Sequence, residues 1–161
     1  MDDEQEGREP INYSPENITK DMNPEAHIET IMTSRPVTIG PDQSMDRVHE
    51  IFCTYNIHHI PVVDPSDRVV GMISKADYYK LQNSFTLFGR KQAQKFNQAV
   101  FESILVKEVM SPQLVMLHPE DEIGVAAGIF KENLFHAIPI VDEDKRLVGI
   151  LSTYDLLSYA F

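Results

Sequence analysis

His58-His59-Ile60-Pro61-Val62-Val63-Asp64 returns later in the chain as His136-Ala137-Ile138-Pro139-Ile140-Val141-Asp142. A second stretch, Gly71-Met72-Ile73-Ser74-Lys75-Ala76-Asp77, returns at the same offset of 78 residues as Gly149-Ile150-Leu151-Ser152-Thr153-Tyr154-Asp155. From residue 31 to residue 77, fifteen of 47 positions are identical in the second copy, without a gap. A repeat at fixed spacing indicates that one supersecondary unit occurs twice, so the repeat decides the architecture.

Each copy has the same order of predicted elements. A short extended piece leads to an amphipathic helix whose apolar residues recur at helical spacing. A buried strand with a Pro near its start follows, then a polar turn, a second strand and a closing helix. In the first copy the extended piece is expected at residues 37–39, the helix at 45–55 and the two strands at 60–63 and 68–73. The closing helices are expected to begin near Ser74 in the first copy and near Ser152 in the second. The sequence therefore predicts an α/β (α+β) fold made of two β-α-β-β-α units.

The net charge of the chain argues against some classes of binding partner. The 161 residues include 25 acidic and 14 basic side chains, a net charge of -11. Such a surface repels phosphate backbones, so we expect neither nucleic acid nor an anionic membrane as a partner. A single cysteine makes an internal disulfide impossible, and no apolar run reaches the roughly 18 residues of a membrane span. These features predict a cytoplasmic protein.

The charge is uneven and suggests the domain boundaries. Nine acidic and two basic residues lie within residues 1–30. This composition buries too little apolar surface to order itself. We expect an acidic disordered tail (1–26), a first repeat (27–81), a helical connector (82–104) and a second repeat (105–161).

The doubled motifs resemble the cystathionine beta-synthase (CBS) domain, whose tandem pair is called a Bateman module. The resemblance rests on the two Pro-containing strands, the two Gly-x-hydrophobic-Ser-x-x-Asp segments, and the openings Ile31-Met32-Thr33 and Val109-Met110-Ser111. It implies that the repeats pack about a pseudo-twofold axis and leave two clefts, which bind adenosine-containing ligands in many members. It also implies a homodimer.

The Ser and Asp of each second motif are the main candidates for binding a ligand. Ser74 with Asp77, and Ser152 with Asp155, stand three residues apart at the start of a predicted helix. A hydroxyl and a carboxylate on one face of a first turn can both bind a ribose diol. The alternative is an ordinary helix cap. The resemblance extends the expected ligand-binding set to Gly71, Gly149, Val37, Thr38, Val115 and Met116.

Three histidines precede the Pro-containing strands, where the family often places basic residues that reach a ligand phosphate. By resemblance, His136 serves the Asp77 site, and His58 with His59 serves the Asp155 site. The position that is commonly Arg in phosphate-binding members holds His59 in one copy and Ala137 in the other. A neutral histidine binds phosphate more weakly than arginine, so phosphate-rich ligands are less favoured. The alternative is a histidine hydrogen-bonded at a strand start.

The residues predict no catalytic group and no metal site. Adjacent side chains of a strand point to opposite faces, so His58 and His59 are poorly placed to share an ion with Asp64. Cys53 lies on the amphipathic helix without a partner pattern for nucleophilic catalysis, and we expect it to be buried.

Together these observations predict a stand-alone regulatory CBS pair that is not an enzyme. Its candidate ligands are AMP, ADP, ATP and S-adenosylmethionine, and it would signal in trans to an unidentified protein. The alternative is a structural or dimerisation module whose clefts hold no ligand. The intact Ser and Asp pairs favour binding, whereas the missing arginines argue against it.

Overall fold

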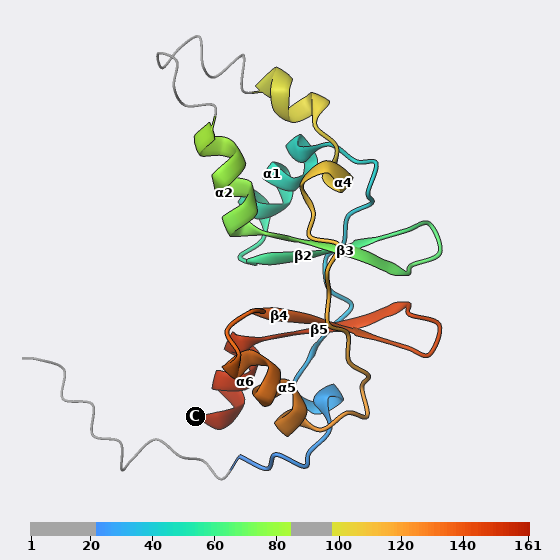
Figure 1. Ribbon diagram of the computed structural model, residues 1–161, viewed down its shortest axis with the longest axis vertical. Coiled ribbons are helices and arrows are strands. Elements are labelled where there is room, and N and C mark those ends of the chain that lie inside the picture. The colour runs from blue at the N-terminus through green and yellow to red at the C-terminus, as the bar shows by residue number, and fades with distance from the viewer. Residues whose placement is uncertain (1–21, 85–97) are drawn as a thin grey trace, which may run out of the picture.

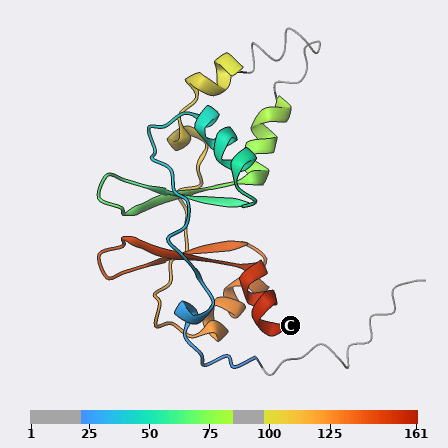
Figure 2. The same ribbon diagram turned by 180° about the vertical axis from the view of Figure 1, so that it is seen from behind.

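Two sheets lie face to face at the centre of the molecule and helices cover their outer faces. The computed structural model describes residues 22–84 and 98–161. Figure 1 shows the hairpin of the first copy above that of the second, with helices above and below the pair. Figure 2 shows the same four layers from behind. This arrangement is the α+β fold that the repeat predicts.

Each sheet is built on an antiparallel hairpin. In the first copy β2 (His59–Val63) pairs with β3 (Val69–Ser74), and in the second β4 (Ala137–Val141) pairs with β5 (Leu147–Ser152). Both pairings shift register before the last residue of the first strand. The strands are apolar and largely buried, because one face packs on helices and the other meets the second sheet.

Two helices flank each hairpin. They are α1 (Met45–Thr54) and α2 (Lys75–Ser84) in the first copy, and α5 (Ile123–Lys131) and α6 (Thr153–Ala160) in the second. The apolar face predicted over residues 45–55 is confirmed for Met45, Val48, Ile51 and Phe52, which are buried, but Tyr55 lies after the end of α1 and is exposed.

The expectation for Cys53 is wrong, because this residue is exposed. It follows the buried Ile51 and Phe52 on α1, and each further residue turns about 100° around a helix axis. This rotation carries Cys53 off the buried face.

The segment that leads each copy pairs with the other copy. The strand β1 (Thr33–Ser34) is antiparallel to β5, and Ser111 makes the equivalent bridge to Met72 of β3. The extended piece predicted at 37–39 forms a single parallel bridge, between Ile39 and Val62, and Leu117 makes the equivalent bridge to Ile140 in the second copy. The sequence identifies the extended segments but not the strand that each one joins.

The leading segments also contribute a side chain to the hydrophobic core of the other copy. The turn of helix η2 (Ile28–Thr30) places Ile28 in the core of the second copy. The short helix α4 (Val106–Val109) places Val106 in the core of the first. Both side chains are fully buried. Each core is therefore completed by residues that precede the other copy in the sequence.

Two glycines make this crossing possible. A Cβ on Gly71 would stand 2.9 Å from Cγ of Met110, and one on Gly149 would stand 2.6 Å from Sδ of Met32. Real Cβ atoms do not approach so closely, so a larger residue at either glycine would force the methionine that crosses β3 or β5 to shift. The repeated glycine thus has a packing role.

Backbone hydrogen bonds connect the tips of the two hairpins. The amide of Val69 donates to the Lys145 carbonyl (3.1 Å), and the amide of Leu147 donates to the Asp67 carbonyl (3.0 Å). These two bonds exchange places under the 78-residue offset, as a pseudo-twofold axis requires.

Parts of the predicted tail and connector lie outside the described residues, namely 1–21 and 85–97. Of the rest of the connector, residues 98–103 are helical and Phe101 is buried in the first core. Residues 22–26, assigned to the tail by composition, pack on α5. The carbonyls of Pro24 and Ala26 accept hydrogen bonds from the amides of Gly124 and Ile123, both at 2.8 Å.

Candidate functional site

Both Ser and Asp pairs close a reciprocal cap at the start of a helix. In the first copy, the Ser74 hydroxyl donates to Oδ2 of Asp77 (2.6 Å) and accepts from the Asp77 amide (3.1 Å). In the second, the Ser152 hydroxyl lies 2.5 Å from Oδ2 of Asp155 and 3.3 Å from the Asp155 amide. The amide of each serine also donates to the same Oδ2 (3.2 and 2.7 Å). The capping interpretation of these pairs therefore holds in both copies.

The caps do not use the whole carboxylate. Both of them engage Oδ2, which leaves Oδ1 outside the cap. In the first copy, Oδ1 of Asp77 lies 3.9 Å from the Lys80 ammonium. Ionised carboxylates have about four acceptor positions, so an Asp held by a cap can still accept from a sugar hydroxyl. Capping fixes the side chain in place and is compatible with ribose binding.

The histidines stand beside these caps. Across the first hairpin His59 is paired with Ser74, so the ring emerges next to the start of α2. The carbonyl of His58 accepts from the Lys75 amide (2.8 Å), and the carbonyl of His136 accepts from the Thr153 amide (3.1 Å). The backbone of each of these histidines thus caps the helix of its own copy.

Residues of both copies influence the pKa of His59. Burial, followed by the nearby His136 and His58, lowers its pKa from 6.5 to about 4, and Asp77 acts in the opposite direction. The imidazole is therefore neutral at physiological pH and can offer a hydrogen bond but no positive charge. The resemblance assigns His59 to the Asp155 site, yet the carboxylate that acts on it is Asp77 of its own copy.

The other predicted residues lie in the extended segments or at the points where a methionine crosses a strand. Val37 packs on the first core, and Thr38 is exposed. Val115 and Met116 are half-buried just before the bridge that Leu117 makes with β4. The two predicted glycines adjoin the crossing methionines, as described above.

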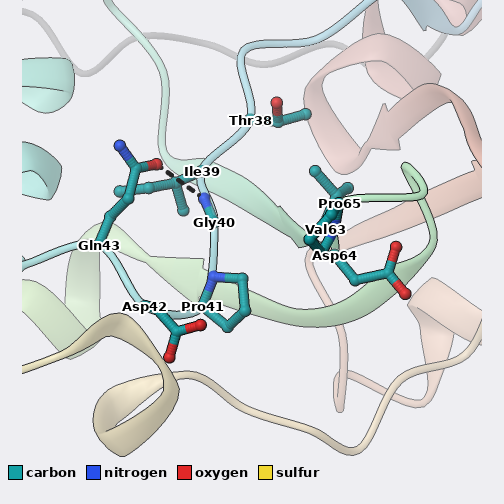
Figure 3. Close-up of a pocket in the computed structure, with 9 residues that line it drawn as sticks. All are labelled: Thr38, Ile39, Gly40, Pro41, Asp42, Gln43, Val63, Asp64 and Pro65. Carbon is teal, nitrogen blue, oxygen red and sulfur yellow. Dashed lines mark hydrogen bonds between the residues drawn. The ribbon is translucent and has the colours of Figure 1, made fainter.

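A hollow of about 430 Å³ lies at the other end of β2. Figure 3 shows its lining, with the Gln43 side chain accepting from the Gly40 amide (2.8 Å). Asp42, on its rim, pairs with the Lys107 ammonium at 2.7 Å. Thr38 is the one predicted site residue that lines it. Because the hollow holds none of the predicted ribose or phosphate groups, we place the candidate site at the His59 end.

Residues 22–84 and 98–161 offer neither a cluster of metal ligands nor a membrane-spanning helix. No group of three or more His, Cys, Asp or Glu side chains in these ranges is arranged to hold a metal ion. No helix in them is long and apolar enough to cross a membrane.

One cluster was missed from the sequence. His49 and Cys53 stand one turn apart on α1, and Tyr78 of α2 contacts His49. The spacing of four residues was a usable signal, but Tyr78 could be added only from the packing of the two helices.

A family model described as the CBS domain matches residues 28–83 and 106–161. The chain belongs to the CBS domain family. The two matches form a tandem CBS pair, and the resemblance drawn from the repeated motifs is confirmed.

Known relatives show the pair in different settings. The chain is 27% identical over 121 residues to an inosine-5'-monophosphate dehydrogenase of Methanocaldococcus jannaschii, which covers 75% of the chain but only 21% of the enzyme. The structure of Arabidopsis thaliana CBSX2 in complex with AMP matches with a TM-score of 0.67 and 24% identity. The match covers 82% of this chain and 93% of that chain. The CBS pair of MJ0100, in complex with methylthioadenosine and S-adenosylmethionine, matches with a TM-score of 0.65 and 23% identity, covering 83% and 94%.

Proposed function

We propose that this CBS pair is a regulatory module that binds an adenosine-containing ligand beside Asp77, Asp155 or both. The observation that carries the proposal is the doubled Ser and Asp cap, which fixes a carboxylate oxygen at equivalent places in both copies. Structural relatives that hold AMP, or methylthioadenosine with S-adenosylmethionine, support the ligand class.

The expected mode of binding follows from the charges present. A carboxylate accepts ribose hydroxyls, and the first amides of a helix favour an anion. His59 brings no charge of its own, so strong selection for a triphosphate is not expected. We propose AMP or S-adenosylmethionine ahead of ADP and ATP.

The output is proposed to be a change in association. The exposed side of α2 and α6, which lie on the same side of the molecule in Figure 1, carries Tyr79, Tyr154 and Leu157. Phe161 adds to this surface at the end of α6. We propose that these side chains form a homodimer contact, and that ligand binding alters how the assembly engages a partner protein.

A second candidate function has its own support. The Ser and Asp pairs already act as caps, and the uncharged His59 provides no positive charge to bind a phosphate. Both facts suit a structural or dimerisation module without a ligand.

A thermal-shift panel separates the two functions, using AMP, ADP, ATP and S-adenosylmethionine, with GMP as the matched control. A ligand that binds only the folded state stabilises it by about 2.7 kcal/mol at 100 times its Kd. We expect an increase in melting temperature with at least one adenosine ligand and none with GMP. If no adenosine ligand changes the melting temperature, the ligand-free module is the better description.

A further inference from the structure

An exposed thiol stands next to an imidazole on the outer face of the first copy. The Cys53 sulfur lies 3.6 Å from Nε2 of His49 and 3.8 Å from Nδ1, one helical turn away. Both residues are exposed on α1. A nucleophile within hydrogen-bond reach of a base is the first element of an activated site.

Tyr78 provides the second element by fixing the imidazole. Its hydroxyl lies 2.6 Å from Nδ1 of His49, and the two rings stack with centroids 5.8 Å apart. Tyr78 is 5% exposed and packs against Phe52 and Phe101. Burial, followed by the nearby Cys53 and Tyr79, raises the pKa of Tyr78, so its hydroxyl stays neutral at pH 7. With its proton on Nδ1, His49 donates to the Tyr78 oxygen and turns the Nε2 lone pair toward the sulfur.

The fold does not require this trio. The 78-residue offset places Ala127, Lys131 and Leu156 where the first copy has His49, Cys53 and Tyr78. Helices α5 and α6 nevertheless occupy the same places on the second sheet as α1 and α2 do on the first. The trio is therefore an addition to one copy of a scaffold that forms without it.

We propose that Cys53 is a modification site for low-molecular-weight disulfides, with His49 as its proton acceptor and Tyr78 as the residue that positions His49. The thiol proton moves to Nε2, and the sulfur attacks one sulfur of the reagent. The disulfide bond of the reagent breaks as the new one forms, and the other sulfur leaves as a thiolate that takes up a proton. Cys53 is oxidised to the mixed disulfide and the reagent is reduced, so no further oxidant is needed.

The test measures the rate of reaction with 5,5'-dithiobis(2-nitrobenzoic acid) from pH 6 to pH 8. The matched control moves the thiol to the other copy by combining Cys53→Ser with Lys131→Cys, because Ala127 offers no base there. At pH 7 we expect the natural protein to react at least about tenfold faster than this control. His49→Gln, which can still hydrogen-bond Tyr78, should fall to the rate of the control.

The pH profile distinguishes an activated thiol from a merely accessible one. Only the thiolate attacks a disulfide, so the rate of the control should fall steeply toward pH 6. The natural protein should show a shallower fall, and His49→Gln and Tyr78→Phe should steepen it. Melting temperatures near that of the natural protein verify that each variant is folded, and mass spectrometry with glutathione disulfide locates the adduct. Equal rates in the natural protein and the control, or a rate indifferent to His49→Gln, would overturn the proposal.

Discussion

At the scale of single residues, His59 shows how neighbours determine the chemistry of a side chain. The sequence predicts a strand that begins just after it, whereas it is the first residue of β2, and its neutral state could not be predicted. That state depends on burial and on His136, 77 positions away in the other copy. The Ser and Asp pairs differ in this respect, because their cap is local and spans only three residues. Both interpretations of those pairs were accessible from the sequence.

His59 gives the protein a stability that depends on pH. Its pKa is lowered in the folded state, so the unfolded chain binds more protons below pH 6.5, and stability is lost as the pH falls from 6.5 to about 4. The full shift corresponds to about 3 kcal/mol, and partial exposure to solvent reduces the expected loss to about 1–2 kcal/mol. Urea unfolding at pH 7 and pH 4 should show this loss in the natural protein and a smaller one in His59→Gln. The exposed His27→Gln is the control; an equal loss in all three proteins would contradict the assignment.

The serine caps should contribute measurably to stability. Ser74→Ala and Ser152→Ala each remove the hydroxyl that accepts from the amide of the aspartate three residues later. Loss of such a cap lowers the free energy of unfolding by about 1 kcal/mol. Denaturant unfolding measures the effect, with the exposed Ser158→Ala as the control. If the cap variants were as stable as this control, the hydrogen bonds described here would not be formed in solution.

At the scale of elements, the repeat predicted the hairpins and the amphipathic helices but missed the exchange of leading segments. Periodicity and turn residues are local signals, so they identify strands such as residues 60–63. Strand partners depend on tertiary packing. The methionine that crosses each glycine was visible in the repeated motifs as Met32 and Met110, but nothing in the sequence joined it to Gly149 or Gly71.

The glycine crossing is tested by adding a single methyl group. Gly71→Ala would force a contact with Met110, and overpacking of this kind usually destabilises by about 1–3 kcal/mol. Gly128→Ala is the control, because its Cβ meets nothing within 4 Å and alanine favours a helix by roughly 1 kcal/mol. Thermal unfolding should thus move in opposite directions in the two variants. Combining Gly71→Ala with Met110→Ala should destabilise by less than the sum of the single changes; strict additivity would argue against the contact.

At the level of the whole molecule, composition assigns residues 1–26 to an acidic tail, and the structure shows that residues 24 and 26 contact α5. Pro24 and Ala26 lie inside the stretch read as tail, yet their carbonyls satisfy the first amides of α5. Backbone acceptors are not encoded by side-chain type, so this contact could not be predicted from the sequence.

Two truncations test that boundary. Removing residues 1–21 should leave the melting temperature within a few degrees, because their composition favours no core. Removing residues 1–26 also takes away both acceptors, and the unsatisfied amides should lower stability by about 1–3 kcal/mol. Calorimetric melting compares the two. Equal melting temperatures would show that these bonds contribute little, and a large loss in the shorter truncation would place part of the acidic segment in the fold.

Isothermal titration calorimetry with AMP and with S-adenosylmethionine tests whether the capped aspartates bind an adenosine ligand. The natural protein should bind saturably. The Asp77→Asn/Asp155→Asn variant keeps a cap acceptor but loses the charge, and should bind about ten- to a hundredfold more weakly without a large change in melting temperature. Equal affinity in the two proteins, or binding of neither AMP nor S-adenosylmethionine by the natural protein, would contradict the proposed function.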